Sequence, residues 1–568
     1  MPPVLTLWLV PIAFYCIWFM LLTYPSILNF STHFFADNGD GFQNVWNIWW
    51  VNEAVARLGT HPWHTHYLHY PGGISLIPHT LNVFNGFLGI PLQWFFDLVK
   101  THNIIVIFSF VAGGLTAFRL SWHLSGCFWG SLIAGWIFTF SNYHFAHAEG
   151  HLQLVSLEWI PLFVLMWWKL NKEPSALTGT YAGLSLLLVL LCDYYYFLYC
   201  ILIGALIFLR TLLLQRQEQK SWSFSNNRNL LLALFVFAGV VVLTCGPLIL
   251  GLARVAREGP MSGAHDPVAS SLDLLAPFIP GGHWMFHSLT KFFWSQLPSN
   301  IHETSVHWGI STCILALIGW CTRKKLPLKG AGFWIFSLVF FTLMALGPKI
   351  HVAGKVLAEI PGPYRLLELC IPFLKLSGNP VRMSVMIFLS LGLLAGAGFE
   401  YLWNKRKKSL RLLSLCLLGL LLLEYFPKPI PNTPHVYPEF IKKLGSLSPH
   451  YGLIDLGKAF SKTESLYYQT FHRIPVFVGY TSRTPYNVIV QDKKIVQTMK
   501  QGDWKTICQD MGFRYLIVPP QTVLKPQVGN RKIILEPFLS LGPFNVIDLQ
   551  NEQTGWTCKP RSAAENSQ

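Results

Sequence analysis

Long apolar runs constrain the fold of this chain more than any other feature of its sequence. A transmembrane α-helix needs about 20 mainly apolar residues to cross ~30 Å of hydrocarbon, and it must satisfy its backbone polar groups internally. The segments that approach or meet this requirement are 5–28, 103–121, 127–141, 152–168, 177–191, 195–214, 229–252, 304–321, 331–346, 383–402 and 409–426. The sequence therefore predicts an all-α polytopic membrane protein with about 11 transmembrane helices.

The composition agrees with this prediction and excludes other classes of protein. Of the 568 residues, 52% are hydrophobic and only 12% are charged, which excludes an ordinary soluble protein. A net charge of +16 would suggest a nucleic-acid partner in a soluble protein. Much of this charge lies in short loops between apolar segments, where basic residues set the membrane orientation, so we expect membrane lipid and no nucleic acid as a partner.

Four short connecting loops are strongly basic, and they determine the predicted topology. Their basic residues are Lys169 and Lys172; Arg210, Arg216, Lys220 and Arg228; Arg323, Lys324, Lys325 and Lys329; and Lys405, Arg406, Lys407, Lys408 and Arg411. The positive-inside rule places all four loops in the cytoplasm. The N-terminus is then cytoplasmic and the C-terminal region extracytoplasmic. The loops that share the outer face are 29–102, 142–151, 253–303 and 347–382.

One further apolar segment, 81–99, is long enough to be considered as a span. If it crossed the membrane, every later loop would change sides and all four basic loops would face outward. We therefore predict that this segment lies in the membrane interface, or enters the membrane and returns, as short segments can when protein covers them.

The composition changes near residue 427, where prolines cluster and the long apolar runs end. Short strand-like segments follow, with helical stretches between them; they are 451–456, 476–480, 515–518 and 533–535. We predict a transmembrane domain over 1–427 and a small extracytoplasmic α/β domain over 428–568. Most cysteines lie in apolar segments as small buried thiols, whereas Cys508 and Cys558 lie in the polar C-terminal region and could pair.

The outer loop 29–102 carries the first candidate site. Asp37 and Asp40 stand just before a stretch, 42–58, in which apolar and aromatic residues recur at helical spacing on one side and polar residues occupy other positions. Tryptophan prefers the headgroup level, so this stretch is interpreted as a helix that lies flat on the bilayer. Asp40 could cap this helix, with Gln43 completing a capping box, or it could be a base that takes a proton from an acceptor hydroxyl. The sequence leaves both roles open.

Two other outer segments carry candidate binding residues. His147 and His151 belong to a run of polar residues at the outer end of a predicted span, where ionisable groups tend to line a site. Arg365, Lys375 and Arg382 lie in loop 347–382. A guanidinium group can bind phosphate with two hydrogen bonds, although an arginine here could also reach the lipid headgroups. The histidines in 61–69 match no metal-binding motif, and we predict no metal ligands.

Several motifs resemble those of bacterial GT-C-type integral membrane glycosyltransferases, a group of largely uncharacterised multi-pass proteins. They are Gly39-Asp40-Gly41 running into Asn44–Trp50, Tyr70-Pro71-Gly72-Gly73, His147 with His151-Leu152-Gln153-Leu154, Leu346-Gly347-Pro348, Asn379-Pro380-Val381-Arg382 and Gly479–Arg483. The resemblance covers most of the chain. It implies a GT-C-like fold in the bacterial inner (plasma) membrane.

The resemblance also implies an activity. Such enzymes take a sugar from a polyprenyl-phosphate donor on the outer face, and the acceptor would be a glycan, a lipid or a protein of the cell envelope. The essential acid of their first outer loop corresponds to Asp40, with Asp37 as the second choice. His147, His151, Arg365, Lys375 and Arg382 are then expected to bind substrate. Whether a divalent metal is needed stays open.

A different class of function is an alternative. The chain could be a transporter or flippase for lipid-linked sugar, or a non-catalytic assembly factor. A carrier site is expected near the middle of the membrane, whereas the ionisable residues here concentrate on one face. This distribution favours the transferase.

Overall fold

The structure is a computed structural model that describes residues 5–218, 228–263, 265–325, 328–371, 374, 378–405, 407–522, 524, 526–528, 531–540 and 542–561. The chain divides into two compact units. The first comprises Met1–Phe30, Asn103–Pro247 and Ala264–Pro431. The second comprises Ser31–His102, Leu248–Gly263 and Asn432–Gln568. The outer loop that carries Asp37 and Asp40 therefore belongs to the same unit as the C-terminal segment.

A helix lies in each segment that the sequence predicts to span the membrane. These helices are α1 (Thr6–Leu22), α4 (Leu98–Ser125), α5 (Phe128–Thr139), α8 (Trp159–Lys172), α9 (Ala176–Cys192), α10 (Tyr194–Glu218), α11 (Arg228–Arg257), α13 (Ile310–Cys321), α14 (Ala331–Ala345), α17 (Ser384–Trp403) and α18 (Lys408–Glu424). Among the described residues, 4 helical segments are long and apolar enough to cross a bilayer alone: Leu98–Ser125, Tyr194–Gln217, Arg228–Arg257 and Pro380–Trp403. The protein is a polytopic membrane protein, and the number of eleven spans stays a prediction.

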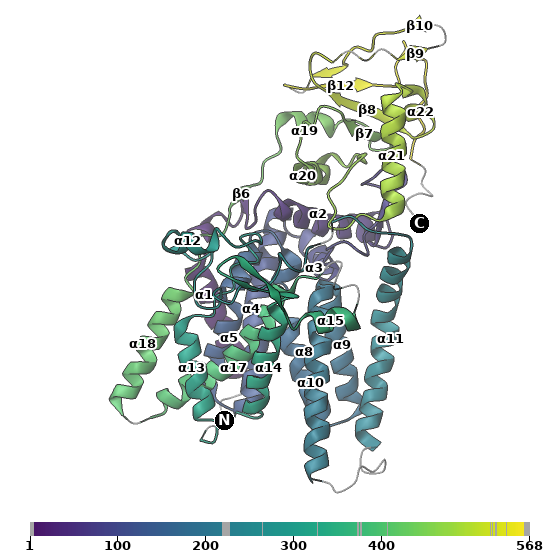
Figure 1. Cartoon of the computed structure of the whole chain (residues 1–568). Helices are drawn as coiled ribbons and strands as arrows, with labels where there is room; N and C mark the ends of the chain where they lie inside the picture. Colours follow the sequence, from purple (N-terminus) through teal and green to yellow (C-terminus); the bar gives the residue numbers. More distant parts are fainter. Residues whose placement is uncertain are drawn as a thin grey trace. The chain divides into compact units, whose positions relative to one another are not determined.

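Helix α17 is the centre of the first unit. It is buried along most of its length, and α5, α13 and α14 pack against it (Figure 1). Glycines allow this close approach: a Cβ atom at Gly396 would meet the backbone oxygen of Gly130 in α5, and one at Gly398 would meet that of Leu315 in α13. Small residues bring helix backbones together in membranes, where packing rather than hydrophobicity drives association.

The loops of the first unit carry shorter elements. They are α6 (Asn142–Ala148), α7 (Leu152–Val155), α12 (Lys291–Trp294), β4 (Lys349–Val352), β5 (Lys355–Pro361), α15 (Arg365–Cys370) and the 3-10 helix η4 (Pro380–Met383). Strands β4 and β5 form an antiparallel hairpin. These elements hold the histidines and arginines that the sequence singled out.

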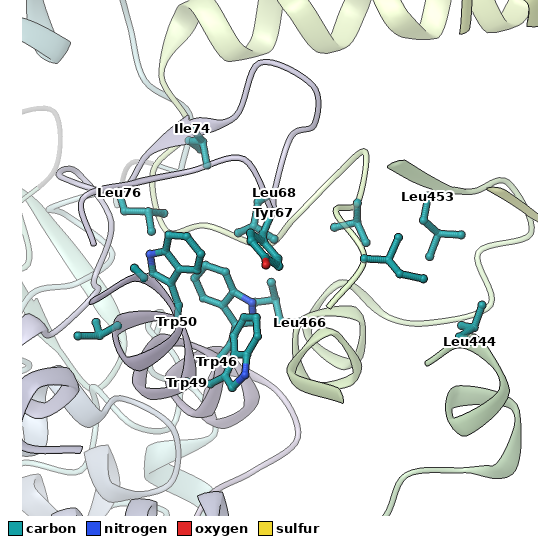
Figure 2. Packing of buried hydrophobic residues seen from close by; sticks show 14 of the residues in the cluster. Trp46, Trp49, Trp50, Tyr67, Leu68, Ile74, Leu76, Leu444, Leu453 and Leu466 are labelled. Atoms are coloured by element: carbon teal, nitrogen blue, oxygen red, sulfur yellow. The ribbon is translucent and has the colours of Figure 1, made fainter. Parts of the chain in front are cut away.

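The second unit is built around α2 (Asp40–Asn52), which packs on α3 (Val83–Gln93) and α20 (Lys462–His472). A π-helical turn, Glu53–Arg57, continues α2, so the predicted helix is present. Its tryptophans, however, do not form a lipid-facing side: Trp46, Trp49 and Trp50 are buried against Tyr67 and residues of the C-terminal segment (Figure 2). The expectation of a helix with a lipid-facing aromatic side is wrong, because these rings pack on protein instead.

The segment after this core agrees with the prediction for 81–99. Helix α3 has 11 residues, which is about 16 Å of helix and too short for a ~30 Å core. A bend separates it from α4, which begins at Leu98. That 81–99 does not cross the membrane stays a prediction, which the length of α3 supports.

The C-terminal part of the second unit holds a small mixed sheet in the order β11-β12-β8-β7. Its strands are β7 (Gly452–Asp455), β8 (Phe513–Val518), β11 (Leu539–Ser540) and β12 (Asn545–Asp548), and α19 (Glu439–Leu444), α20, α21 (Tyr486–Lys500) and α22 (Trp504–Gln509) accompany them. The predicted strands at 476–480 and 533–535 form only isolated bridges. Cys508 and Cys558 form a disulfide. The boundary at 427/428 stays a prediction.

Short two-stranded pairs complete the second unit. They are β1 (His33–Phe34) with β6 (Thr433–Pro434), β2 (His64–Thr65) with β3 (Ile74–Ser75), and β9 (Gln527–Val528) with β10 (Arg531–Lys532). The first of these pairs joins the start of the outer loop to the start of the C-terminal segment.

Candidate functional site

Asp37, not Asp40, satisfies the amino end of α2. The Asp37 Oδ1 atom accepts hydrogen bonds from the backbone N–H groups of Gly39 (2.9 Å) and Gly41 (2.8 Å). The N-cap position is Gly39, and Asp40 is the first helical residue. A carboxylate that binds two amide groups at a helix amino end is stabilised there by the unpaired N–H groups and the helix dipole. The hypothesis that Asp40 caps the helix, with Gln43 three residues later, is therefore wrong.

Asp40 has a different environment. Its Oδ1 atom accepts a hydrogen bond of 2.8 Å from the hydroxyl of Tyr480, which lies 440 residues later in the chain. The carboxylate is half-buried. Burial and the charge of Asp40 raise the pKa of Tyr480 well above its ordinary value, so the phenol stays protonated and donates to the carboxylate. The arrangement fixes the orientation of a carboxylate that retains contact with solvent.

A network of neutral polar side chains continues from Asp40 along α2. The Gln43 side chain donates to the Thr80 hydroxyl (2.9 Å), and Asn47 lies 3.1 Å from His79 Nε2 through its Oδ1 atom. The backbone N–H of Ser482 donates to His79 Nδ1 at 3.1 Å, so Nδ1 is the acceptor and Nε2 carries the proton. Burial lowers the pKa of His79 to about 3, although the charge of Asp40 acts against this shift. The ring is neutral at neutral pH.

A second cluster lies in the first unit and is ionic. Arg382 donates through Nε (2.9 Å) and Nη2 (2.6 Å) to Glu303 Oε1, and the Asn379 side chain donates to the same oxygen at 3.1 Å. Both charged side chains are almost completely buried. Burial acts to raise the pKa of Glu303, but the charge and hydrogen bonds of Arg382 hold it below its ordinary value. Glu303 is therefore a carboxylate, and its Oε2 atom has no hydrogen-bond partner among the described residues.

Two of the predicted histidines belong to this ionic cluster. His147, in α6, lies with Nε2 3.8 Å from Glu303 Oε2, and its Nδ1 is 3.1 Å from His151 Nδ1. Burial first, and then the positive charges around it, lower the pKa of His147 well below its ordinary value. The structure therefore brings together three predicted residues, His147, His151 and Arg382.

Of the remaining predicted binding residues, Arg365 has a different environment. Arg365 is the first residue of α15 and is exposed. Lys375 lies outside the described residues. Of the three alternative phosphate ligands that the sequence suggested, Arg382 belongs to the ionic cluster, and the choice among them stays a prediction.

A third polar cluster in the first unit contains Glu149, His283, His302 and Lys428. Glu149 Oε2 lies 3.1 Å from His283 Nε2 and 3.8 Å from His302 Nδ1, and Glu149 Oε1 lies 3.0 Å from Lys428 Nζ. Within the described parts of the chain, Glu149, His283 and His302 form one group whose donor atoms could hold a metal ion. No metal ligands were predicted from the sequence, in which these residues come from two different loops, 142–151 and 253–303.

Tyr480, Asn379 and Glu303 are among the residues of these clusters that the sequence did not identify as site residues. Tyr480 belongs to a motif that resembles the GT-C pattern, but nothing in its own neighbourhood indicates an acidic partner. Asn379 also lies in such a motif. Glu303 carries the clearest signal, because it is an acidic residue directly before a predicted span, where ionisable groups are usually functional.

One protein family matches most of this chain. Residues 12–423 match a protein family described as "Domain of unknown function (DUF6311)". A search of curated proteins found no match.

Several solved structures resemble this one. The arabinofuranosyltransferase AftD from Mycobacteria has 13% sequence identity and a TM-score of 0.49; the match covers 90% of this chain and 35% of that chain, so this chain spans about a third of that protein. ArnT from Cupriavidus metallidurans, bound to undecaprenyl phosphate, has 10% identity and a TM-score of 0.48, with 93% and 98% covered. The oligosaccharyltransferase of Archaeoglobus fulgidus has 10% identity and a TM-score of 0.42, with 90% and 68% covered. These structures are GT-C glycosyltransferases, the class that the sequence motifs resemble.

Proposed function

The chain belongs to the family described as a domain of unknown function (DUF6311), and we propose that it transfers a sugar from a polyprenyl-phosphate donor to a hydroxyl group of a cell-envelope acceptor. The acceptor is a glycan, a lipid or a protein. The motifs that resemble GT-C glycosyltransferases support this class of reaction, and the geometry around Asp40 supports it at the level of a residue.

The environment of Asp40 is the observation that carries the proposal. Asp37 already satisfies the helix amino end, so the fold of α2 does not require a carboxylate at position 40. The Tyr480 hydroxyl orients Asp40 through Oδ1, and the side chain is only half-buried. A general base needs this combination of a fixed orientation and access to the proton that it removes. In this proposal Asp40 is a catalytic residue and Tyr480 is a positioning residue.

The ionic cluster of the first unit supports recognition of a phosphate group. The two hydrogen bonds to Glu303 use Nε and Nη2 of Arg382 and leave Nη1 outside this ion pair. A planar guanidinium held on one side in this way can donate to a phosphate oxygen with the other. We assign this role to Arg382, with His147 and His151 as neighbouring substrate contacts. Arg365 and Lys375 stay second choices for the same role.

The proposed reaction is a transfer with inversion at the anomeric carbon. Asp40 takes the proton of the acceptor hydroxyl as its oxygen attacks the anomeric carbon of the donor sugar. The bond between that carbon and the phosphate oxygen breaks, and its electron pair leaves with the polyprenyl phosphate. Electrostatic stabilisation of the charge that develops on the phosphate is often the largest single contribution to catalysis.

The proposal places the reaction on the outer face of a bacterial inner membrane, with the N-terminus in the cytoplasm. The Cys508–Cys558 disulfide supports an extracytoplasmic position for the C-terminal segment, since disulfides persist mainly in oxidising compartments. Labelling of Lys325 and Asn487, each replaced by cysteine, should report opposite sides of the membrane.

Turnover of a defined donor tests the proposed activity. Purified full-length protein in liposomes is supplied with polyprenyl-phosphate sugars of known identity and a mixture of envelope acceptors. We expect consumption of one donor with release of free polyprenyl phosphate. Movement of intact donor across the bilayer without release of polyprenyl phosphate would contradict the transferase and favour a flippase.

A further inference from the structure

Glu149, His283 and His302 form a cluster that the proposed reaction does not use. Glu149 follows α6, whereas His283 and His302 come from the loop between α11 and α13. Glu149 and His283 are buried, and His302 is partly exposed. The donor atoms of the three side chains all lie within 4.8 Å of one another. Two nitrogen donors and one carboxylate oxygen are a ligand set that suits zinc and related divalent transition metals.

The hydrogen bonds of Ser305 determine the tautomer of His283. The single hydroxyl proton of Ser305 is directed to the backbone oxygen of Ile301, at 3.0 Å. The Ser305 oxygen also lies 2.7 Å from His283 Nδ1. When Ser305 donates to Ile301, it accepts from His283, and Nδ1 carries the hydrogen. In a neutral ring, Nε2 then presents a lone pair.

This lone pair faces another acceptor. His283 Nε2 lies 3.1 Å from Glu149 Oε2, and it is a buried atom with no hydrogen-bond partner. A lone pair of a neutral ring and a carboxylate oxygen repel each other at this distance unless a cation lies between them. The Nδ1 hydrogen bond to Ser305 is also the usual way in which an outer partner orients a metal-binding histidine.

From these contacts we infer that Glu149, His283 and His302 bind a divalent transition metal of the zinc class. Ligand bonds of ~2.1 Å in a tetrahedral arrangement place the donor atoms on the order of 3.4 Å apart. His283 Nε2 and Glu149 Oε2 are already 3.1 Å apart, so it is mainly His302 Nδ1, 3.8 Å from Glu149 Oε2, that needs to move inward. His302 Nδ1 exchanges its contact with the backbone oxygen of Ala146, at 3.0 Å, for the metal. Lys428 contacts the other carboxylate oxygen, Oε1, and balances the charge of Glu149.

The position of the site suggests what the metal does. His302 is followed directly by Glu303, the partner of Arg382. A metal that joins Glu149 to His302 holds this loop against α6, which carries His147. The site is therefore a structural clamp that fixes the geometry of the ionic cluster, and it leaves a coordination position for water. This role does not depend on the identity of the sugar donor.

Metal content tests the inference directly. Full-length protein in detergent, with any affinity tag removed, is stripped with a chelator, exposed to zinc and passed through a desalting column. We expect about one zinc per chain by mass spectrometry of the metal, and a rise in the unfolding temperature on addition of zinc. Both effects should be lost in His283→Ala and Glu149→Gln. His450→Ala removes an exposed histidine elsewhere and should behave as the wild type.

Two further measurements test the inference if the first variants fold poorly. His302→Ala changes the most exposed ligand and is expected to keep the fold while it weakens zinc binding at least tenfold. Cobalt bound to the wild-type protein should show the visible absorption of a tetrahedral site. No stoichiometric metal in the wild type, or unchanged zinc content in the folded variants, would overturn the inference and leave an imidazolium–carboxylate pair.

Discussion

The two acidic centres of this protein hold their carboxylates by opposite means. Asp40 is half-buried, a neutral group, the Tyr480 hydroxyl, donates to its Oδ1 atom, and His79 is also neutral. Glu303 is buried with a full positive charge, Arg382, bound to one of its oxygens. A buried charge pair depends on both partners, whereas a half-exposed carboxylate can be neutralised without leaving an unpaired charge. The buried pair of Glu303 and Arg382 is therefore coupled to stability, whereas the half-buried Asp40 is available for chemistry.

The largest effect is expected at Glu303. Glu303→Gln leaves the buried guanidinium of Arg382 without its counter-charge, and removal of one partner of a buried pair typically costs about 3–5 kcal/mol. Thermal unfolding in detergent should show a large drop in the unfolding temperature. The double variant Glu303→Gln with Arg382→Gln removes both charges and should recover much of the loss. A Glu303→Gln protein as stable as the wild type would contradict the claim that this buried charge pair, unlike Asp40, is coupled to stability.

A smaller effect is expected at Asp37. Asp37→Ala removes the acceptor of two backbone N–H groups at the start of α2, and loss of such a cap costs about 0.5–2 kcal/mol. Asp37→Asn should be almost silent in thermal unfolding, because asparagine caps nearly as well as aspartate. If Asp37→Ala were also silent, the assignment of the capping role to Asp37 would be wrong.

His79 should make the stability of the second unit depend on pH. The folded-state pKa of about 3 lies below the ordinary value of about 6.5, so the unfolded chain takes up a proton first as the pH falls. Stability is therefore present above about pH 6.5 and is lost progressively below it, by about 1 kcal/mol near pH 5.5. His79→Gln should lose less stability than the wild type over this range, as measured by chemical unfolding. Equal losses would show that His79 is not held neutral.

At Tyr480 the expected effect is on the transfer rate rather than on stability. Tyr480→Phe removes one hydrogen bond to Asp40, a contact to a charged group that contributes about 1.5–3 kcal/mol at most. Because Asp40 stays in place, we expect roughly a tenfold loss of transfer rate, with an unchanged affinity for the donor. A loss as large as that of an Asp40 variant would mean that Tyr480 itself takes part in the chemistry.

The helices of this protein could be predicted from the sequence because the bilayer imposes their length and composition. A helix lies in each of the apolar segments that were singled out, from α1 to α18. The burial of α2 could not be predicted in the same way. Trp46 donates to the side chain of Gln469, which lies 423 residues later, and no local pattern indicates that partner. The tryptophans therefore indicated contact with lipid, whereas in the structure they pack against protein.

The candidate sites were predictable only in part, for the same reason. The sequence identified Asp37 and Asp40 but left their roles open, because the cap depends on backbone geometry between Asp37 and Gly41. It identified Arg382 but not Glu303, since 79 residues separate them. The metal ligands were missed because His283 and His302 come from one loop and Glu149 from another. Local patterns reveal residue types at a site, whereas long-range contacts decide their roles.

The comparison of Asp40→Asn with Asp37→Asn tests the central claim most directly. Both changes keep a side chain that can accept a hydrogen bond, and neither residue is needed in its ionised form for the fold. Asp40→Asn removes the proton acceptor and should lower the transfer rate by about 10²–10⁴-fold, with an unfolding temperature close to that of the wild type. Asp37→Asn should retain most of the activity. An Asp40→Asn protein that transfers sugar at the wild-type rate would contradict the account.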